Sequence, residues 1–258
     1  MFFHLRVFMH SVLFFLILEA VVRESVSDFL SSLVSGNLSL LFLITIVYVL
    51  VLGVSALKIG KRWAMLPIPI MLGLSSVGLL AFIDSDTKKF AFIVLTSIVY
   101  YFCLLGLYRF KSCHKDQTAR GMIAATAVSA IFLFYCSAYG IYLNFSIPLW
   151  VVMILFLLPT TLISYQYFQL IEEDKGKVWL YSLVIGLAMT EISWVLNFWP
   201  FGYLTTGVTM LIFYYVLWDM VQSYFLKIMS KGRVVTNIVF FGILATMVLM
   251  SSRWLPVV

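Results

Sequence analysis

The sequence predicts an all-α fold, a polytopic transmembrane helical bundle of about nine spanning helices. Of its 258 residues, 63% are hydrophobic and 11% are charged. A soluble domain carries about a quarter charged residues, so this chain has too few charges to cover a water-facing surface. Its apolar residues form long continuous runs, whereas the strands of a membrane barrel would alternate apolar and polar residues. The whole chain, residues 1–258, is therefore expected to form a single integral membrane domain.

The individual spans follow from the lengths of the apolar runs. A helix needs about 20 apolar residues to cross the hydrocarbon layer of a bilayer. The first run follows Arg6 and has no small-residue cleavage site after it, so we expect a retained helix rather than a signal peptide. The predicted spans cover residues 7–22, 38–57, 63–83, 90–108, 121–143, 148–170, 178–198, 201–225 and 234–252.

The basic residues indicate the orientation of the chain. Thirteen of the 17 Lys and Arg residues fall on the side of the N-terminus in this topology, and four fall on the opposite side. Cytoplasmic loops carry the Lys/Arg excess, so the N-terminus is predicted inside and the C-terminus outside. The net charge of +6 is explained by this distribution. We therefore expect the lipid bilayer to be the partner of this protein, and we expect no nucleic-acid partner.

Glu191 is the main candidate for a functional residue. It lies 14 positions after Lys177, which corresponds to about 21 Å of helix and places it in the outer half of the hydrocarbon layer. An ionised carboxylate is costly at that depth, so the group should be neutral, paired or exposed to a polar cavity. Trp194 shares its helix face and Asn197 lies close by, so these residues complete the candidate binding set.

Two interpretations of Glu191 remain open. In the first, it is a ligand or proton site in the outer half of the bundle. In the second, it is a protonated residue that hydrogen-bonds across a helix interface, with Tyr214 or Thr209 as its expected partner. Asp219, near the inner end of the eighth span, is the remaining candidate binding residue. We expect it to be an interfacial residue or a partner for a lysine or arginine of a cytoplasmic loop.

Two segments near the C-terminus resemble each other. Residues 175–178 (KGKV) resemble residues 231–234 (KGRV), and Gly186 matches Gly242 at the same offset of 56 residues. A duplicated helical hairpin would explain this similarity, but any array of membrane hairpins has about the same period. If the hairpin is duplicated, both glycines should contact an adjacent helix near mid-membrane.

The motifs of membrane enzymes and metal sites are missing from the sequence. There is no HExxH, no CxxC and no glycine-rich phosphate loop, and the three histidines all fall near the inner face. An ion-coupled pump usually needs several ionisable groups within the membrane, and in this sequence only Glu191 clearly qualifies as such a group. We therefore predict no catalytic residue, no metal and no cofactor, and we favour a protein that is not an enzyme.

Three functional hypotheses follow. The leading one is a non-enzymatic scaffold or assembly component of a membrane complex, with other membrane proteins as partners, in a plasma or inner membrane. The second is a transporter or channel for a small or lipid-like molecule that uses Glu191. The third is an enzyme acting on a lipid-linked substrate. A cavity reaching Glu191 would favour transport, a lateral opening beside basic loops would favour lipid chemistry, and an exposed apolar groove would favour assembly.

Overall fold

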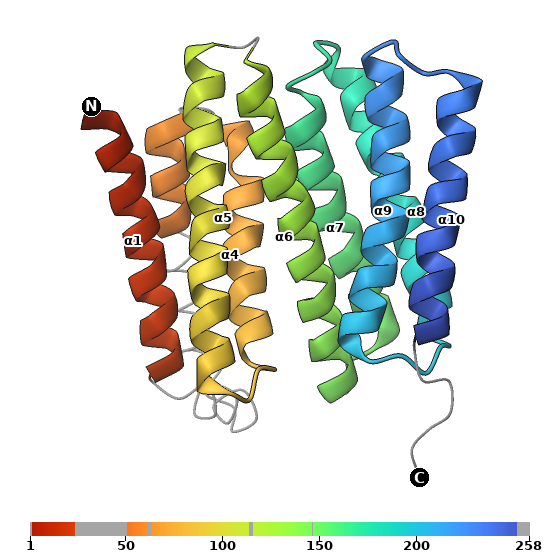
Figure 1. The fold of residues 1–258 in the computed structure, drawn as a ribbon, viewed down its shortest axis with the longest axis horizontal. Coiled ribbons are helices and arrows are strands. Elements are labelled where there is room, and N and C mark those ends of the chain that lie inside the picture. The colour runs from red at the N-terminus through yellow and green to blue at the C-terminus, as the bar shows by residue number, and fades with distance from the viewer. Residues whose placement is uncertain (1, 24–50, 61–62, 114–115, 146, 252–258) are drawn as a thin grey trace. The chain divides into compact units, whose positions relative to one another are not determined.

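The computed structural model describes residues 2–23, 51–60, 63–113, 116–145 and 147–251 (Figure 1). Within these ranges the regular structure is entirely helical, so the predicted fold class is confirmed. Eight of the described helices are long and apolar enough to cross a membrane. Most of the predicted span 38–57 lies outside the described residues, and its last part belongs to the helix Val51–Gly60.

The remaining elements follow the predicted spans closely. A short 3-10 helix, η1 (Trp63–Met65), leads into α4, whose first turn holds Pro67 and Pro69. Proline is tolerated there because the first helical N–H groups have no partner within the helix. The long helices are α1 (Phe2–Arg23), α4 (Pro67–Leu80), α5 (Asp86–Ser112), α6 (Gln117–Asn144), α7 (Leu149–Phe168), α8 (Lys175–Leu196), α9 (Tyr203–Phe225) and α10 (Lys231–Ser251).

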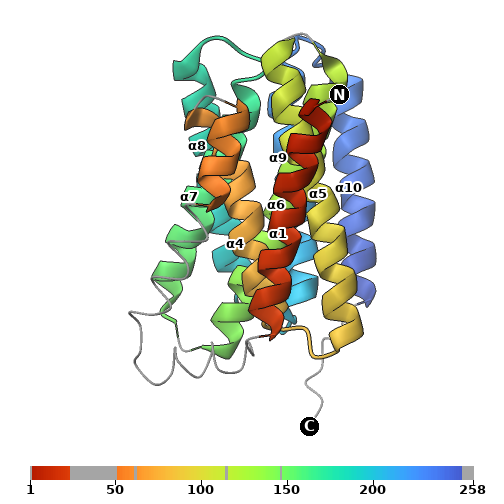
Figure 2. The same cartoon turned by 90° about the vertical axis from the view of Figure 1, so that its left-hand side faces the viewer.

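The chain divides into two compact units, Met1–Ala130 and Ile131–Val258. In the first unit, α1 and α4 both pack against α5 (Figures 1 and 2). The ring of Phe14 in α1 stacks on that of Tyr100 in α5, with centroids 4.3 Å apart. In the second unit, α7 to α10 alternate in direction, so the basic connectors that follow α7 and α9 lie at the same end (Figure 1). This arrangement agrees with the charge alternation that the sequence predicts for this part of the chain.

The core of the second unit combines aromatic packing with hydrogen bonds between helices. Tyr135 of α6 stacks on Phe156 of α7, and its hydroxyl lies 3.0 Å from the hydroxyl of Thr160. Tyr214 of α9 hydrogen-bonds Ser164 of α7 across 3.2 Å. All of these side chains are buried, so each hydroxyl finds its partner inside the protein. These bonds tie α7 to both α6 and α9.

The two glycines of the proposed repeat have different surroundings. Gly186 of α8 is buried against α7, where an added Cβ would lie 3.1 Å from the carbonyl oxygen of Leu157. Gly242 of α10 is exposed and has nothing within 4 Å of an added Cβ. The contact predicted for Gly186 is confirmed and the one predicted for Gly242 is wrong. Because α10 packs on α9 and leaves most of its surface exposed, the glycines do not support a duplicated hairpin.

Candidate functional site

Glu191 lies on helix α8, and a side-chain cap determines where this helix begins. The carboxylate of Asp174 accepts hydrogen bonds from the backbone N–H groups of Gly176 at 3.0 Å and Lys177 at 3.3 Å. Such a cap satisfies N–H groups that have no partner within the helix. The hydrogen bond from Lys177 is the main cause that holds the pKa of Asp174 below its usual value. From this fixed start, α8 continues without interruption to Leu196.

The outward surface of α8 carries the candidate carboxylate. Glu191 is exposed, and it shares this surface with large apolar side chains at helical spacing. We define the α8 outer face as Leu180, Val184, Leu187, Glu191, Trp194 and Phe198, all of which are exposed. Trp194 lies on the same stripe as Glu191, as the sequence predicts, and Phe198 follows it on that stripe. The sequence did not indicate that this stripe points away from the neighbouring helices.

The expected hydrogen-bond partners of Glu191 are engaged elsewhere. The hydroxyl of Tyr214 pairs with Ser164, and the hydroxyl of Thr209 donates to the carbonyl of Thr205 in its own helix at 2.8 Å. Both residues are buried, whereas Glu191 is exposed. The predicted bond from Glu191 to Tyr214 or Thr209 is therefore wrong, and the carboxylate points outward instead of into the helix interface.

Trp194 and Asn197 take different positions relative to Glu191. The indole of Trp194 is 47% exposed and meets the ring of Phe198 edge-on, with centroids 5.5 Å apart. An aromatic cluster near a helix end is typical of a membrane–water interface. Asn197 is the C-cap of α8, and its backbone N–H bonds the carbonyl of Ser193 at 3.2 Å. Trp194 therefore lies on the α8 outer face together with Glu191, whereas Asn197 lies at the end of the helix.

Asp219 forms a polar cluster between α9 and α10. Its carboxylate lies 3.5 Å from the guanidinium of Arg233, and it also accepts a hydrogen bond from the side-chain amide of Asn237. Arg233 and Asn237 are four positions apart and so share one face of α10. The side chain of Asp219 is 13% exposed, which makes this a partly buried ion pair. Of the two expectations for Asp219, this contact agrees with the alternative one, a partner for a lysine or arginine, whereas Asn237 was missed.

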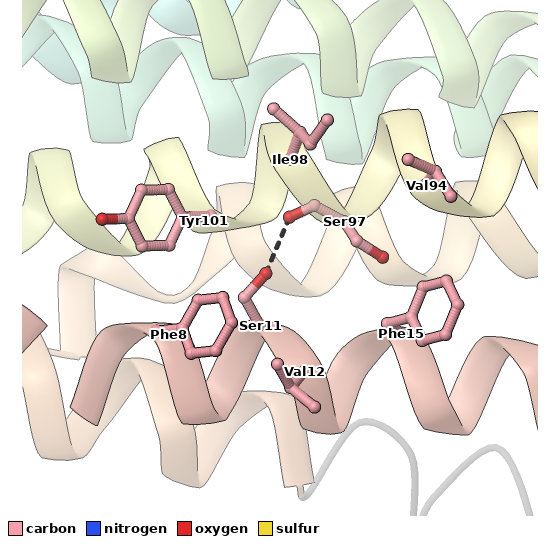
Figure 3. Close-up of a pocket in the computed structure, with 8 residues that line it drawn as sticks. All are labelled: Phe8, Ser11, Val12, Phe15, Val94, Ser97, Ile98 and Tyr101. Atoms are coloured by element: carbon pink, nitrogen blue, oxygen red, sulfur yellow. Dashed lines mark hydrogen bonds between the residues drawn. The ribbon is translucent and has the colours of Figure 1, made fainter. Parts of the chain in front are cut away.

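A second feature is an apolar groove in the first unit, between α1 and α5 (Figure 3). Its volume is about 370 Å³. Phe8 and Phe15 from α1 and Tyr101 from α5 form its aromatic walls, and Ser11 and Ser97 meet between the two helices. We call this the α1–α5 groove. This groove could not be predicted from the sequence because its lining is as apolar as the other helix surfaces.

The connector between α5 and α6 carries an ion pair. Asp116 accepts a hydrogen bond from the backbone N–H of Ala119 at 3.2 Å and another from Arg109 at 2.9 Å. The Ala119 N–H, followed by the Arg109 side chain, lowers the pKa of the Asp116 carboxyl. In the described part of the chain, no group of three or more His, Cys, Asp and Glu side chains could hold a metal ion.

Eight of the described helices are long and apolar enough to cross a membrane, which is the pattern of a multi-pass membrane protein. Residues 52–254 match a family described as "Protein of unknown function (DUF5656)", and the chain belongs to that family. No curated protein and no solved structure matches the chain.

Proposed function

We propose that this protein is a non-enzymatic component of a membrane complex, and that the α8 outer face contacts another membrane protein. The observation that carries the proposal is the exposed carboxylate of Glu191 on an otherwise apolar helix surface. It lies about 21 Å along the helix from Lys177, so it sits in the outer half of a spanning helix. A carboxylate facing hydrocarbon is unfavourable unless a cation or a hydrogen-bond donor accompanies it. A partner helix would supply that group.

The other charged candidate already has its partners within the chain. Arg233 and Asn237 surround the Asp219 carboxylate, so this group links α9 to α10. Because Asp219 has its partners within the chain and Glu191 is exposed, the contrast supports an intermolecular role for Glu191 and not for Asp219. The transport hypothesis needs a polar path that reaches Glu191, whereas the α1–α5 groove lies in the other unit and is lined by apolar side chains. Assembly therefore fits the described geometry better than transport or lipid chemistry.

The proposed location is a plasma or inner membrane, with the N-terminus in the cytoplasm. The basic connectors that follow α7 and α9 lie at one end of the second unit, and this supports the orientation. Lipid then covers the remaining exposed apolar surfaces, including most of α10. The α8 outer face differs from these surfaces because it holds a carboxylate as well as apolar side chains.

The size of the complex in mild detergent tests the proposal. Tagged wild-type protein, Glu191→Leu, Glu191→Gln and Val184→Leu would be solubilised from native membranes and compared by native gel electrophoresis. Val184→Leu is the matched control because it lies on the same face and changes no charge. Wild type and the control should migrate as a complex larger than the 29.5 kDa chain. Glu191→Leu should release the single chain, and Glu191→Gln should retain part of the complex through its amide.

The thermal stability of each purified variant provides the second readout. Because Glu191 is exposed, both of its substitutions should unfold at the wild-type temperature. A wild-type protein that migrates as a single chain would contradict the proposal. So would a Glu191→Leu variant that remains in a complex of full size.

A further inference from the structure

The α1–α5 groove lies in the first unit and does not involve the α8 outer face. Phe8 in its wall is 55% exposed and Ile98 at its edge is 48% exposed, so the groove opens to the outside of the helix pair. Its volume of about 370 Å³ lies at the lower end of the range found for small-molecule sites. The space suits one compact apolar molecule or one segment of a chain.

The groove lies well inside the length of the two helices. Helix α5 has 27 residues, which is about 40 Å, and Ser97 lies about 16 Å from the start of α5. Ser11 lies about 14 Å from the start of α1 by the same measure. When these helices span a bilayer, both serines therefore lie within the hydrocarbon layer. A molecule in the groove would have to be dissolved in that layer.

Ser97 provides a polar group inside this apolar space. Its backbone carbonyl accepts a hydrogen bond from the Ser11 hydroxyl at 2.8 Å. Its own hydroxyl has no hydrogen-bond partner among the described residues, although Ser97 is only 7% exposed. Figure 3 shows this hydroxyl projecting from α5 into the space between the helices, toward the side of Phe15. A buried hydroxyl in this position is a donor without an acceptor.

The neighbouring residue shows the ordinary alternative. Thr96 is also buried, and its hydroxyl donates to the carbonyl of Phe92 at 2.9 Å, one turn earlier in α5. Serine and threonine hydroxyls in helices commonly donate a hydrogen bond to a backbone carbonyl one turn earlier in this way. Ser97 points instead into the groove, where aromatic rings surround the open space. A ligand that fills this space would have to be apolar and to present one hydrogen-bond acceptor.

We infer that the α1–α5 groove binds a membrane-dissolved apolar molecule with a carbonyl oxygen, which accepts a hydrogen bond from Ser97. The rings of Phe8, Phe15 and Tyr101 pack against the apolar body of this ligand, and flat rings or chains suit such walls best. The ester carbonyls of phospholipids lie in the interfacial region outside the hydrocarbon layer, so they do not reach the depth of Ser97. The ligand class is therefore an apolar ketone or quinone-like molecule.

Benzophenone is a suitable probe because it is apolar, has one ketone and reacts with nearby C–H groups under ultraviolet light. Purified full-length protein in detergent would be labelled at several probe concentrations, and the adducts would be located by peptide mass spectrometry. Saturable labelling should concentrate on the parts of α1 and α5 that line the groove. Ser97→Ala should weaken the apparent affinity about threefold to tenfold, which is the effect of one lost hydrogen bond.

Two further variants separate the hydroxyl from the apolar space. Thr96→Val removes the neighbouring hydroxyl, which does not face the ligand, and should leave labelling at the wild-type level. Val12→Trp fills the groove from α1 and should abolish the saturable labelling. Ser97→Ala leaves the backbone acceptor of Ser11 in place, so its fold should be unchanged. Thermal unfolding of each variant checks this point.

Labelling spread evenly over exposed helices would overturn the inference, as would labelling that Val12→Trp leaves intact. Labelling that is lost in Val12→Trp but equal in Ser97→Ala and wild type would also overturn it, because the groove would then accept apolar molecules without recognising a carbonyl. These results are independent of the complex size measured for the Glu191 variants.

Discussion

The two units of the chain place their buried hydroxyl groups in different ways. In the second unit, Tyr135 bonds Thr160 and Tyr214 bonds Ser164, so that side chains connect one helix to the next. In the first unit, the hydroxyls of Ser76 and Thr96 donate to carbonyls of their own helix, and the bond from Ser11 of α1 to α5 ends on the backbone carbonyl of Ser97 rather than on a side chain. Hydrogen bonds between helices stabilise the packing of one helix on another in membranes. A side-chain bond to a carbonyl of the same helix does not join that helix to a neighbour.

The two units also differ in the features on which the proposals rest. The first unit leaves an apolar groove between α1 and α5, with the hydroxyl of Ser97 turned into it. In the core of the second unit, stacked rings and bonds such as that from Tyr135 to Thr160 connect neighbouring helices, and Glu191 lies on the outside. A similar set of apolar helices thus presents a concave site in one unit and a charged outer surface in the other.

The largest effect is expected where helices approach most closely. Gly186→Leu should lower the free energy of unfolding by about 1–3 kcal/mol or more, because the new side chain would meet the α7 backbone near Leu157. Gly242→Leu is the matched control, since α10 leaves that position open. Thermal or denaturant unfolding of the two variants measures the difference. Equal stabilities would show that α7 and α8 are not tightly packed.

A smaller effect is expected from one interhelical hydrogen bond. Tyr214→Phe removes the hydroxyl that bonds Ser164 and should cost about 0.6 kcal/mol, with an upper value near 1.7 kcal/mol. Tyr101→Phe in the first unit is the control, because its half-buried ring lines the groove edge. Unfolding measurements should show a loss for Tyr214→Phe alone. If both variants were equally stable, the contrast between the two units would lose its energetic basis.

The pH dependence of the two connectors should be smaller still. The pKa values of Asp116 and Asp174 are both lowered from 3.8 in the folded protein. Their stabilising effect is therefore present above pH 3.8 and is lost as the pH falls through the lowered values. Asn substitutions at the two positions should flatten this loss in a series of thermal unfolding curves. Variants that follow the wild-type pH profile would show that these caps contribute nothing.

The sequence predicted the spans well because membrane helices need long apolar runs, and these runs are visible without any knowledge of contacts. It also placed Trp194 on the face of Glu191, because residues three apart share a helix face. It failed on which face points inward. In a soluble protein the apolar stripe marks the core, but lipid is as apolar as the core, so that signal is missing here.

The same physical limit explains the other errors. Gly186 and Gly242 have similar local sequences, yet only the first lies against another helix. For Asp219, a lysine or arginine partner was one of two expectations, and the sequence did not indicate that Arg233 of α10 would be that partner. The bond between Tyr135 and Thr160 was missed because it depends on which helices are neighbours. Local spacing determines the stripe on a helix, and tertiary packing determines what the stripe contacts.

Site-specific photo-crosslinking from the α8 outer face tests the central claim most directly. A photoreactive phenylalanine analogue would replace Trp194, which is 47% exposed, and the control would carry it at Leu158 of α7, which is 56% exposed. Irradiation of intact membranes should link position 194 to one other protein, and the additional change Glu191→Leu should remove that product. Position 158 should give no such product. Equal products from both positions, or a product at 194 that persists in Glu191→Leu, would contradict the claim that Glu191 specifies an assembly surface.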